Sequence, residues 1–302
     1  MMLNGPPRGW TRRRIHRRLW FAIALAACTR VSVESEQKPG PTGHEQRPGP
    51  TGHTTPAAEA KAERDLASAT KAPPPPLAQV TPEVVSHGPR NEKRIALTFD
   101  ACSTRDVSKY DERVTKELIA TKTPATIFLG GSWAAEEPEH VKQLSANPLF
   151  ELGNHSYTHP HMAAITDEVR IRRELQRTQA EITRLTGATP KLFRPPYGEY
   201  NDRLVKIAAE LGLTTVEYDL ASGDPDQHAT KDRLVHWVLS RAQPGSIIVM
   251  HINHRRFHTA EALPDIISGL RARGFELVPV GELIGRTHGE DVHPEVSQAS
   301  PR

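Results

Sequence analysis

The sequence is poor in the residues that hold small proteins together. It contains two cysteines, Cys28 and Cys102, so a disulfide framework is excluded unless these two pair with each other. Aromatic residues make up 5% of the 302 residues and hydrophobic residues 37%, which is low for a wholly globular chain. Proline, by contrast, occurs 26 times. We therefore expect a long polar segment attached to one domain of ordinary composition.

Long hydrophobic runs are also missing. The apolar run at residues 19–27 is short, whereas a bilayer-spanning helix needs about 20 residues. Arginines precede this run and small residues close it, which is typical of an export signal. Its end, Leu-Ala-Ala-Cys at Cys28, resembles the lipobox of bacterial lipoproteins. The resemblance implies a signal peptide over residues 1–28 and a lipid on Cys28, which then cannot pair with Cys102. The alternative is a plain signal peptide cut near Cys28, or a short anchor.

Charge is distributed unevenly along the chain. The formal net charge is +3 at pH 7, but six arginines and no acid lie within residues 1–28. The remainder holds 33 basic and 36 acidic residues without a basic stripe, so we expect no nucleic-acid partner. The resemblance to a lipobox implies that the chain lies in the bacterial cell envelope, with a lipid anchor as its contact to the membrane. In a diderm species the expected location is the periplasmic side of the outer membrane.

Residues 29–90 have the composition of a linker. They contain 11 of the 26 prolines, and the stretch 37–44 recurs almost unchanged at 46–53. Two polar copies are too few to build a solenoid. We predict a disordered linker here, with an r.m.s. span of about 40 Å, and a second disordered segment at residues 286–302. One folded domain is expected between them, at residues 91–285.

Strand-forming runs alternate with helical periodicity across this domain. The strongest helix signal covers residues 167–186, where we expect Thr166 and Gly187 to cap the two ends. Alternation of this kind predicts an α/β fold with parallel strands around a barrel. The expected strands are residues 94–99, 126–129, 149–152, 192–193, 214–218, 246–250 and 275–278, and the other expected helices begin near Asn201, Lys231 and Thr259.

Polar residues follow five of these strands. The carboxyl ends of parallel strands share one face of a barrel, where catalytic groups collect. We therefore expect one site from residues at five strand ends: Asp100, then Asn154 with His155, then Arg194, Asp219 and His251.

Two of these segments favour specific chemistry. His155 and His159 are four apart, and Pro160 follows directly, so a loop is more probable than a helix face. Two imidazoles in one loop can hold a divalent metal and leave positions open. Arg194 precedes two prolines that stiffen its loop, and an arginine held beside an acid keeps that acid ionised. The simpler interpretations are two histidines that share a helix face, and a structural turn with a surface arginine.

Asp100 and His251 complete an arrangement suited to amide hydrolysis. An acid takes the proton from water, a metal polarises the carbonyl, and a histidine protonates the leaving amine. Either residue alone has a simpler explanation, since Asp100 can cap a turn and His251 can be a structural histidine. Backbone N–H groups around Tyr197 can donate to an oxyanion.

The pieces together resemble the motifs of polysaccharide deacetylases, the family 4 carbohydrate esterases with a NodB homology domain. The similar segments are residues 98–100, 155–160, 194–198, 218–224 and 249–251, in the family's order and spacing.

This resemblance implies a distorted (β/α) barrel, a divalent metal that is often zinc, and removal of acetyl groups from sugars. It implies that His155 and His159 are metal ligands, that Asp100 is the general base with Arg194 as its partner, and that His251 is the general acid.

The sequence departs from the family pattern at three places. Ala101 stands where a second aspartate binds the metal, the aspartate that tunes the catalytic histidine aligns with Ala221, and Pro225 replaces the aromatic residue expected after Asp224. Either other residues serve or activity has been lost. For the missing ligand we expect Asp100 first, then Asp106, then Cys102, with water as the remaining possibility. Asp219 and Asp224 are the candidates to tune the histidine.

We therefore expect a metal-dependent hydrolase that deacetylates an envelope polysaccharide, peptidoglycan or another N-acetylglucosamine polymer. Pro196, Tyr197 and Asp224 are expected to contact the polysaccharide substrate. The main alternative is a glycan-binding module on a decayed enzyme scaffold. The retained Asp100 and His251 favour the enzyme, because binding alone needs no acid–base set. A thiol function of Cys102 is a third possibility.

Overall fold

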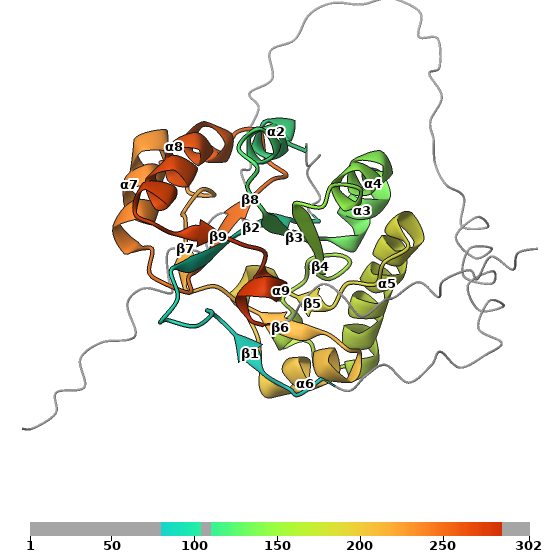
Figure 1. Ribbon diagram of the computed structural model, residues 1–302. Coiled ribbons are helices and arrows are strands. Elements are labelled where there is room, and N and C mark those ends of the chain that lie inside the picture. The colour runs from blue at the N-terminus through green and yellow to red at the C-terminus, as the bar shows by residue number, and fades with distance from the viewer. Residues whose placement is uncertain (1–79, 104–109, 286–302) are drawn as a thin grey trace, which may run out of the picture. The chain divides into compact units, whose positions relative to one another are not determined.

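The computed structural model describes residues 80–103 and 110–285, and within them it contains one parallel sheet of nine strands (Figure 1). The strand order is β1-β6-β5-β4-β3-β2-β8-β7, with β9 beside β2, so β1 and β7 form the edges of an open, distorted half-barrel. This confirms the predicted α/β barrel class. The strands are β1 Val84–Val85, β2 Arg94–Ala101, β3 Ala125–Leu129, β4 Phe150–Asn154, β5 Leu192–Phe193, β6 Thr214–Val216, β7 Leu220–Ala221, β8 Ile247–His251 and β9 Glu276–Leu277.

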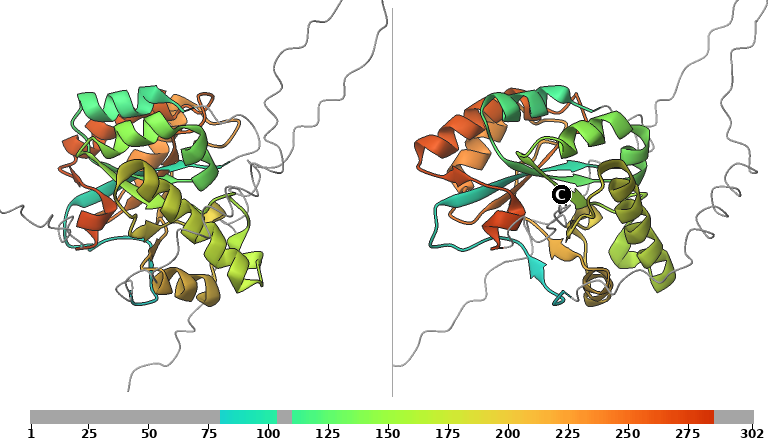
Figure 2. Two further views of the ribbon diagram at one scale, coloured as in Figure 1. Left: turned by 90° about the vertical axis from the view of Figure 1, so that its right-hand side faces the viewer. Right: turned by 45° about the vertical axis from the view of Figure 1, so that its right-hand side comes forward.

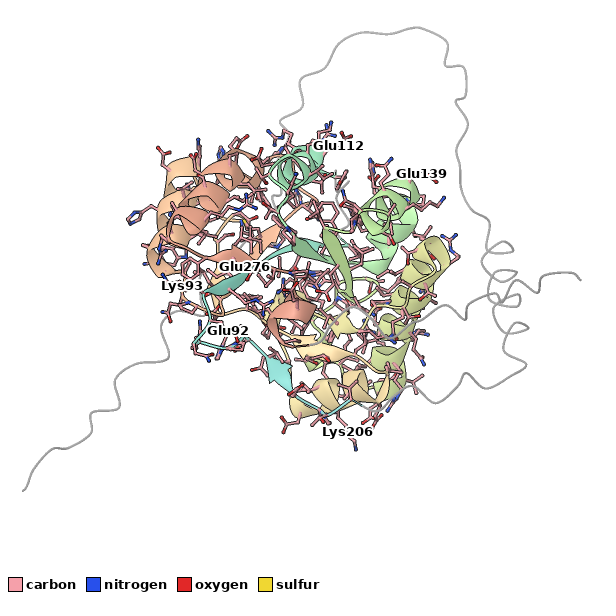
Figure 3. The ribbon with its side chains drawn as sticks, in the orientation of Figure 1. Glu92, Lys93, Glu112, Glu139, Lys206 and Glu276 are labelled. Carbon is pink, nitrogen blue, oxygen red and sulfur yellow. The ribbon has the colours of Figure 1, made fainter. Side chains whose placement is uncertain are left out.

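Helices surround the strands, as the two views in Figure 2 show. Charged side chains on them, among them Glu139 and Lys206, project from the outer surface in Figure 3. In the described part of the chain, no helix has the length and apolar character needed to cross a bilayer. The helices are α2 Glu112–Ala120, α3 Gly131–Glu136, α4 Pro138–Ser145, α5 Glu168–Thr186, α6 Asp202–Glu210, α7 Lys231–Arg241, α8 Thr259–Ala272 and the short α9 Val280–Leu283.

The longest helix, α5, forms where the periodicity predicted it. Its apolar side packs on the sheet, and Ile171, Leu175 and Ile182 are each no more than 1% exposed. The N-cap is Asp167 rather than the expected Thr166, because the Asp167 carboxylate accepts from the N–H of Val169 at 2.9 Å. Gly187 ends the helix as predicted, in the left-handed conformation at φ 76°.

The amino-terminal end of the barrel is filled by packing. Side chains from β2, β3, β5, β6 and β8 meet there, and Val280 and Leu283 of α9 belong to the same apolar cluster. The buried Glu151 carboxylate accepts from Thr126 Oγ1 at 2.7 Å and from the N–H of Gly281 at 3.0 Å. A buried acid with such donors is satisfied structurally. Catalytic groups are therefore expected at the carboxyl-terminal end of the strands.

Two expectations about chain layout need correction. β1 lies inside the predicted linker at residues 29–90 and pairs Val84 with Thr215, so ordered structure begins earlier than residue 91. Asp219 does not lie at the carboxyl end of the barrel. It directly precedes β7, which runs parallel to β8 and pairs Leu220 with Ile248, so Asp219 lies level with the start of β8. The Asp219 carboxylate accepts from the N–H of Ile247, at the start of β8, and pairs with Arg90 at 2.7 Å.

Several expectations lie outside the described residues. These are the signal peptide at residues 1–28 with Cys28, most of the linker, Asp106 and the segment 286–302.

Candidate active site

The carboxyl ends of the strands bring the expected residues together. Asp100 at the end of β2 lies directly opposite His251 at the end of β8. Asn154 at the end of β4 pairs with Phe193, and Arg194 follows as the next residue. Parallel register thus places these groups at one rim, as predicted for all but Asp219.

Asp100 is held by a buried ion pair. Arg194 Nη1 donates to Asp100 Oδ1 at 2.9 Å and to Thr98 Oγ1 at 2.8 Å, while its guanidinium lies over the Phe128 ring. Burial would raise the pKa of Asp100, but Arg194, followed by His155 and His251, lowers that pKa below its ordinary value. The carboxylate is therefore ionised. Removing either partner of such a pair leaves an unpaired buried charge, which typically costs about 3–5 kcal/mol.

His251 has its own carboxylate, Asp224. The two side chains meet at 3.0 Å between Nδ1 and Oδ1, and Asp224 Oδ2 also accepts from the His251 N–H at 2.7 Å. Burial would lower the pKa of His251, but Asp224 raises it well above the ordinary value. Of the two candidates to tune this histidine, the structure thus brings Asp224 to it and places Asp219 at the far end of the barrel.

The expected substrate contact by Asp224 does not fit this geometry. Asp224 is 2% exposed, and besides His251 its oxygens accept from Thr259 Oγ1 at 2.7 Å and Ser222 Oγ at 3.0 Å. A carboxylate engaged on both oxygens has no free face for a sugar. Pro196 is also buried and shapes its turn. Among the three expected substrate contacts, only Tyr197 offers accessible surface.

His155 and His159 lie beside Cys102. One nitrogen of His155, the sulfur of Cys102 and one nitrogen of His159 all lie within 4.8 Å of one another, and all three residues are buried. His155 Nδ1 donates to the Arg194 carbonyl at 2.8 Å, so Nε2 is left to face Cys102 Sγ at 3.7 Å. Asp100, the third ligand expected first, is not part of this group, and Arg194 holds one of its oxygens.

These donors fit a zinc-type metal. Tetrahedral coordination at the usual Zn–S and Zn–N lengths places a thiolate and an imidazole nitrogen about 3.5 Å apart. The 3.7 Å between Cys102 Sγ and His155 Nε2 agrees with that spacing. Two imidazoles and a thiolate are donors that zinc accepts, and three protein ligands leave a fourth position for water or substrate.

The loop that carries the two histidines is held in a strained conformation. Ser156 and His159 have positive φ angles of 60° and 56°, which non-glycine residues seldom adopt. Glu174 of α5 clamps the loop, since its carboxylate accepts from the N–H groups of Tyr157 and Thr158 at 2.9 and 2.8 Å. Strain of about 1–3 kcal/mol per residue persists only where surrounding contacts impose it, and it concentrates at functional sites.

Glu217, which follows β6, is not among the residues that the sequence patterns single out. This residue is 7% exposed, and its Oε1 has no hydrogen-bond partner in the described part of the chain. Burial raises the pKa of Glu217 to about 7, with Asp100 adding to the rise and Arg194 opposing it.

His161 was also missed, although it follows Pro160 directly. Its ring stacks on Tyr197 with centroids 4.1 Å apart, and its Nδ1 lies 2.9 Å from Glu199 Oε2. Tyr197 in turn meets the His159 ring edge-on at 4.6 Å. Together, His161 and Tyr197 form an aromatic platform beside the candidate metal ligands.

Known proteins show the same fold and sequence pattern. A profile of the family described as polysaccharide deacetylase matches residues 87–216. A peptidoglycan-N-acetylglucosamine deacetylase of Bacillus cereus is 31% identical over 194 residues, which cover 63% of this chain and 68% of that protein. The peptidoglycan-N-acetylmuramic acid deacetylase PdaA of Bacillus subtilis is 30% identical over 201 residues, covering 65% and 73%.

One similar solved structure belongs to a protein described as a pseudoenzyme. The crystal structure of a family 4 carbohydrate esterase pseudoenzyme from Bacillus anthracis superimposes with a TM-score of 0.62 at 30% identity, covering 68% of this chain and 70% of that one. The family therefore includes a member without activity. On its sequence and fold, this chain belongs to the polysaccharide deacetylase family.

Proposed function

We propose that this protein is a metal-dependent hydrolase that removes N-acetyl groups from an amino-sugar polymer of the bacterial envelope, with peptidoglycan as the first choice. The observation that carries this proposal is the presence of two separate acid–base pairs at one rim. Asp100 is paired with Arg194 at 2.9 Å, and His251 is paired with Asp224 at 3.0 Å. A binding module has no use for an ionised acid and a protonated histidine facing the same site.

The residues can complete amide hydrolysis. A divalent cation, with zinc as our choice, would polarise the acetyl carbonyl and acidify the attacking water when bound at His155 and His159. Asp100 takes one proton from that water while the water oxygen bonds to the acetyl carbon. His251 then gives its proton to the sugar nitrogen as the C–N bond breaks. The products are acetate and a free amino sugar. Asp100 and the acetic acid lose their protons to solvent, and His251 takes one proton back from solvent.

The partner residues keep each group in the state that its role requires. Arg194 favours the ionised form of Asp100, which a base needs. Asp224 favours the protonated form of His251, which an acid needs. Substrate contact is assigned to the Tyr197 and His161 rings, since flat aromatic faces suit the apolar faces of sugar rings.

A glycan-binding module remains a second candidate, because Ala101 cannot ligate a metal and a relative is described as a pseudoenzyme. The test is acetate release by the purified zinc-loaded protein from N-acetylated peptidoglycan, with acetylated xylan in parallel. Release from peptidoglycan supports the proposal. Release from xylan alone would refute the choice of an amino sugar, and binding to peptidoglycan without any acetate release would favour the module.

We propose further that Cys28 carries a lipid, which would tether the domain through the linker within reach of the cell wall. In cells fed radiolabelled palmitate, the wild-type protein should become labelled and Cys28→Ser should not. Label that persists in Cys28→Ser would exclude this anchor.

A further inference from the structure

The metal-binding group lacks the carboxylate that the family pattern supplies at position 101. Ala101 is fully buried, and its side chain belongs to the main apolar cluster of the domain. Asp100 is not part of the group that Cys102 forms with His155 and His159, Arg194 binds one of its oxygens, and the role of general base requires the other. The pair of histidines therefore needs a donor from another residue.

Cys102 is presented to the histidines by a fixed backbone. The strand ladder continues up to it, since Gly130 N–H donates to the Ala101 carbonyl at 2.9 Å. The buried Asn253 side chain donates to the Cys102 carbonyl at 2.9 Å, and Ser103 Oγ accepts from the N–H of Trp133 at 3.2 Å. With the backbone held on both sides, the direction of the Cys102 side chain is a built feature of the site.

The surroundings of the sulfur are those of a ligand. Cys102 is 7% exposed and unpaired, and its sulfur lies within 4.8 Å of a nitrogen on each of His155 and His159. The Nδ1 of His155 carries the proton that it donates to the Arg194 carbonyl, so its Nε2 lone pair is available on the side of the sulfur. A buried structural cysteine would need only apolar neighbours.

We propose that the Cys102 thiolate is the third protein ligand of the metal and replaces the carboxylate missing at position 101. This rests on the proposed function for the presence of a metal. The site then has one sulfur and two imidazole donors, a set that prefers zinc to magnesium, calcium or manganese. Metal binding releases the thiol proton to solvent. Asp100 is left free to act as the base.

Cobalt is the probe that reads this ligand directly. Co²⁺ substituted for zinc in the full-length protein should give an intense near-ultraviolet charge-transfer band from thiolate to metal. The band should disappear in Cys102→Ser and persist in Cys28→Ser, which removes the other cysteine of the sequence. Retention of the band in Cys102→Ser would overturn the proposal, whatever the enzyme activity.

Zinc affinity provides the second measurement. Loss of an outer-shell partner weakens metal binding about 10–100-fold, so loss of a ligand in Cys102→Ser should weaken it at least as much. Cys102→Asp, which restores a carboxylate nearby, should bind zinc better than Cys102→Ser while lacking the cobalt band. Equal zinc affinity in the wild type and Cys102→Ser would also overturn the proposal.

A nucleophilic Cys102 activated by His251 is the rival interpretation. It predicts an acetyl group on the Cys102 sulfur, formed as the C–N bond breaks and then hydrolysed by water. Mass spectrometry of the metal-free protein mixed with substrate tests this. An acetylated Cys102 would overturn the ligand role, and an unmodified thiol in an active zinc-loaded protein supports it. Absence of acetate release with an intact cobalt band would reject the proposed activity while keeping the ligand.

Discussion

The two halves of the site are built differently. The proton-handling half consists of Asp100, Arg194, Asp224 and His251, in which each titrating group meets an opposite charge within 3.0 Å. The ligand half consists of Cys102, His155 and His159, whose donor atoms lie within 4.8 Å of one another, and its approach to a carboxylate is longer, at 3.8 Å between His155 Nε2 and Asp100 Oδ2.

The difference between the halves follows from what each must do. Proton transfer needs fixed charge, so the proton-handling half depends on strand register, with Asp100 opposite His251 on adjacent strands. A metal needs only donors that converge at one point, so a loop residue at position 102 can replace a strand residue at position 101. We infer that the ligand half can change its residues more readily than the proton-handling half.

The largest expected effect separates the two halves. Asp100→Asn and His251→Ala should each lower kcat by about 10²–10⁴-fold, because each removes a general acid or base. Zinc content should be unchanged in both variants. Asp219→Asn is the matched control, since this acid lies at the opposite end of the barrel and should keep its activity. Kinetics, metal analysis and thermal melting check these outcomes. Loss of zinc in Asp100→Asn would show that the halves are not separate.

A second effect concerns the stability cost of Glu217 beside the proton-handling half. Its pKa is about 7 in the folded protein, above the unfolded value of about 4.3. The folded state therefore holds the proton more tightly, and the free energy of unfolding falls as pH rises between those values. Glu217→Gln, which cannot titrate, should be more stable than the wild type by roughly 3 kcal/mol at pH 8 and about equal at pH 4.

Denaturant unfolding across this pH range measures that difference. Glu136→Gln on α3 is the control, because Glu136 is exposed and its replacement should leave the pH dependence unchanged. A constant difference between wild type and Glu217→Gln from pH 4 to pH 8 would contradict the buried-acid interpretation.

A third effect tests the carboxylate behind the catalytic histidine. Asp224→Asn should lower kcat by about 10–100-fold, the usual effect of removing a partner that orients a functional histidine. Because Asp224 raises the pKa of His251, the variant should lose its protonated acid at lower pH. The alkaline limb of the kcat profile should therefore shift to lower pH, and the zinc content should stay constant. A uniform loss of kcat without a shift would indicate a purely structural role.

The fold could be predicted because its signals are periodic and local. The run at β2 and the regular spacing in α5 mark a strand and a helix without tertiary information, and parallel strands then dictate a shared rim. Asp100, Arg194 and His251 were found because each stands at the end of such a strand, or directly after it. β1 was missed because two residues in a proline-rich stretch carry no periodicity.

The direction of loop residues could not be predicted in the same way. Asp219 and Asp224 both follow β6 closely, and only the pairing of β7 with β8 between them brings one to Ile247 and the other to His251. Cys102 was expected only third as a ligand, because its orientation depends on Asn253, a residue 151 positions away. Contacts of this range leave no trace in local sequence.

The smallest effect concerns the outer edge of the ligand half, where His161 stacks on Tyr197 and pairs with Glu199. An aromatic pair contributes about 0.5–1.5 kcal/mol beyond its buried area, so loss of this ring in His161→Ala should raise KM for the polymer about 2–10-fold. His161→Phe keeps the flat ring while losing the Glu199 contact, and it should retain most of the affinity. Both variants should leave kcat and zinc content unchanged, since His161 neither transfers a proton nor binds metal. Steady-state kinetics on soluble peptidoglycan fragments measure the split. An unchanged KM in His161→Ala would show that the His161–Tyr197 platform does not take part in substrate recognition. A fall in the zinc content of His161→Ala would show that His161 contributes to metal binding.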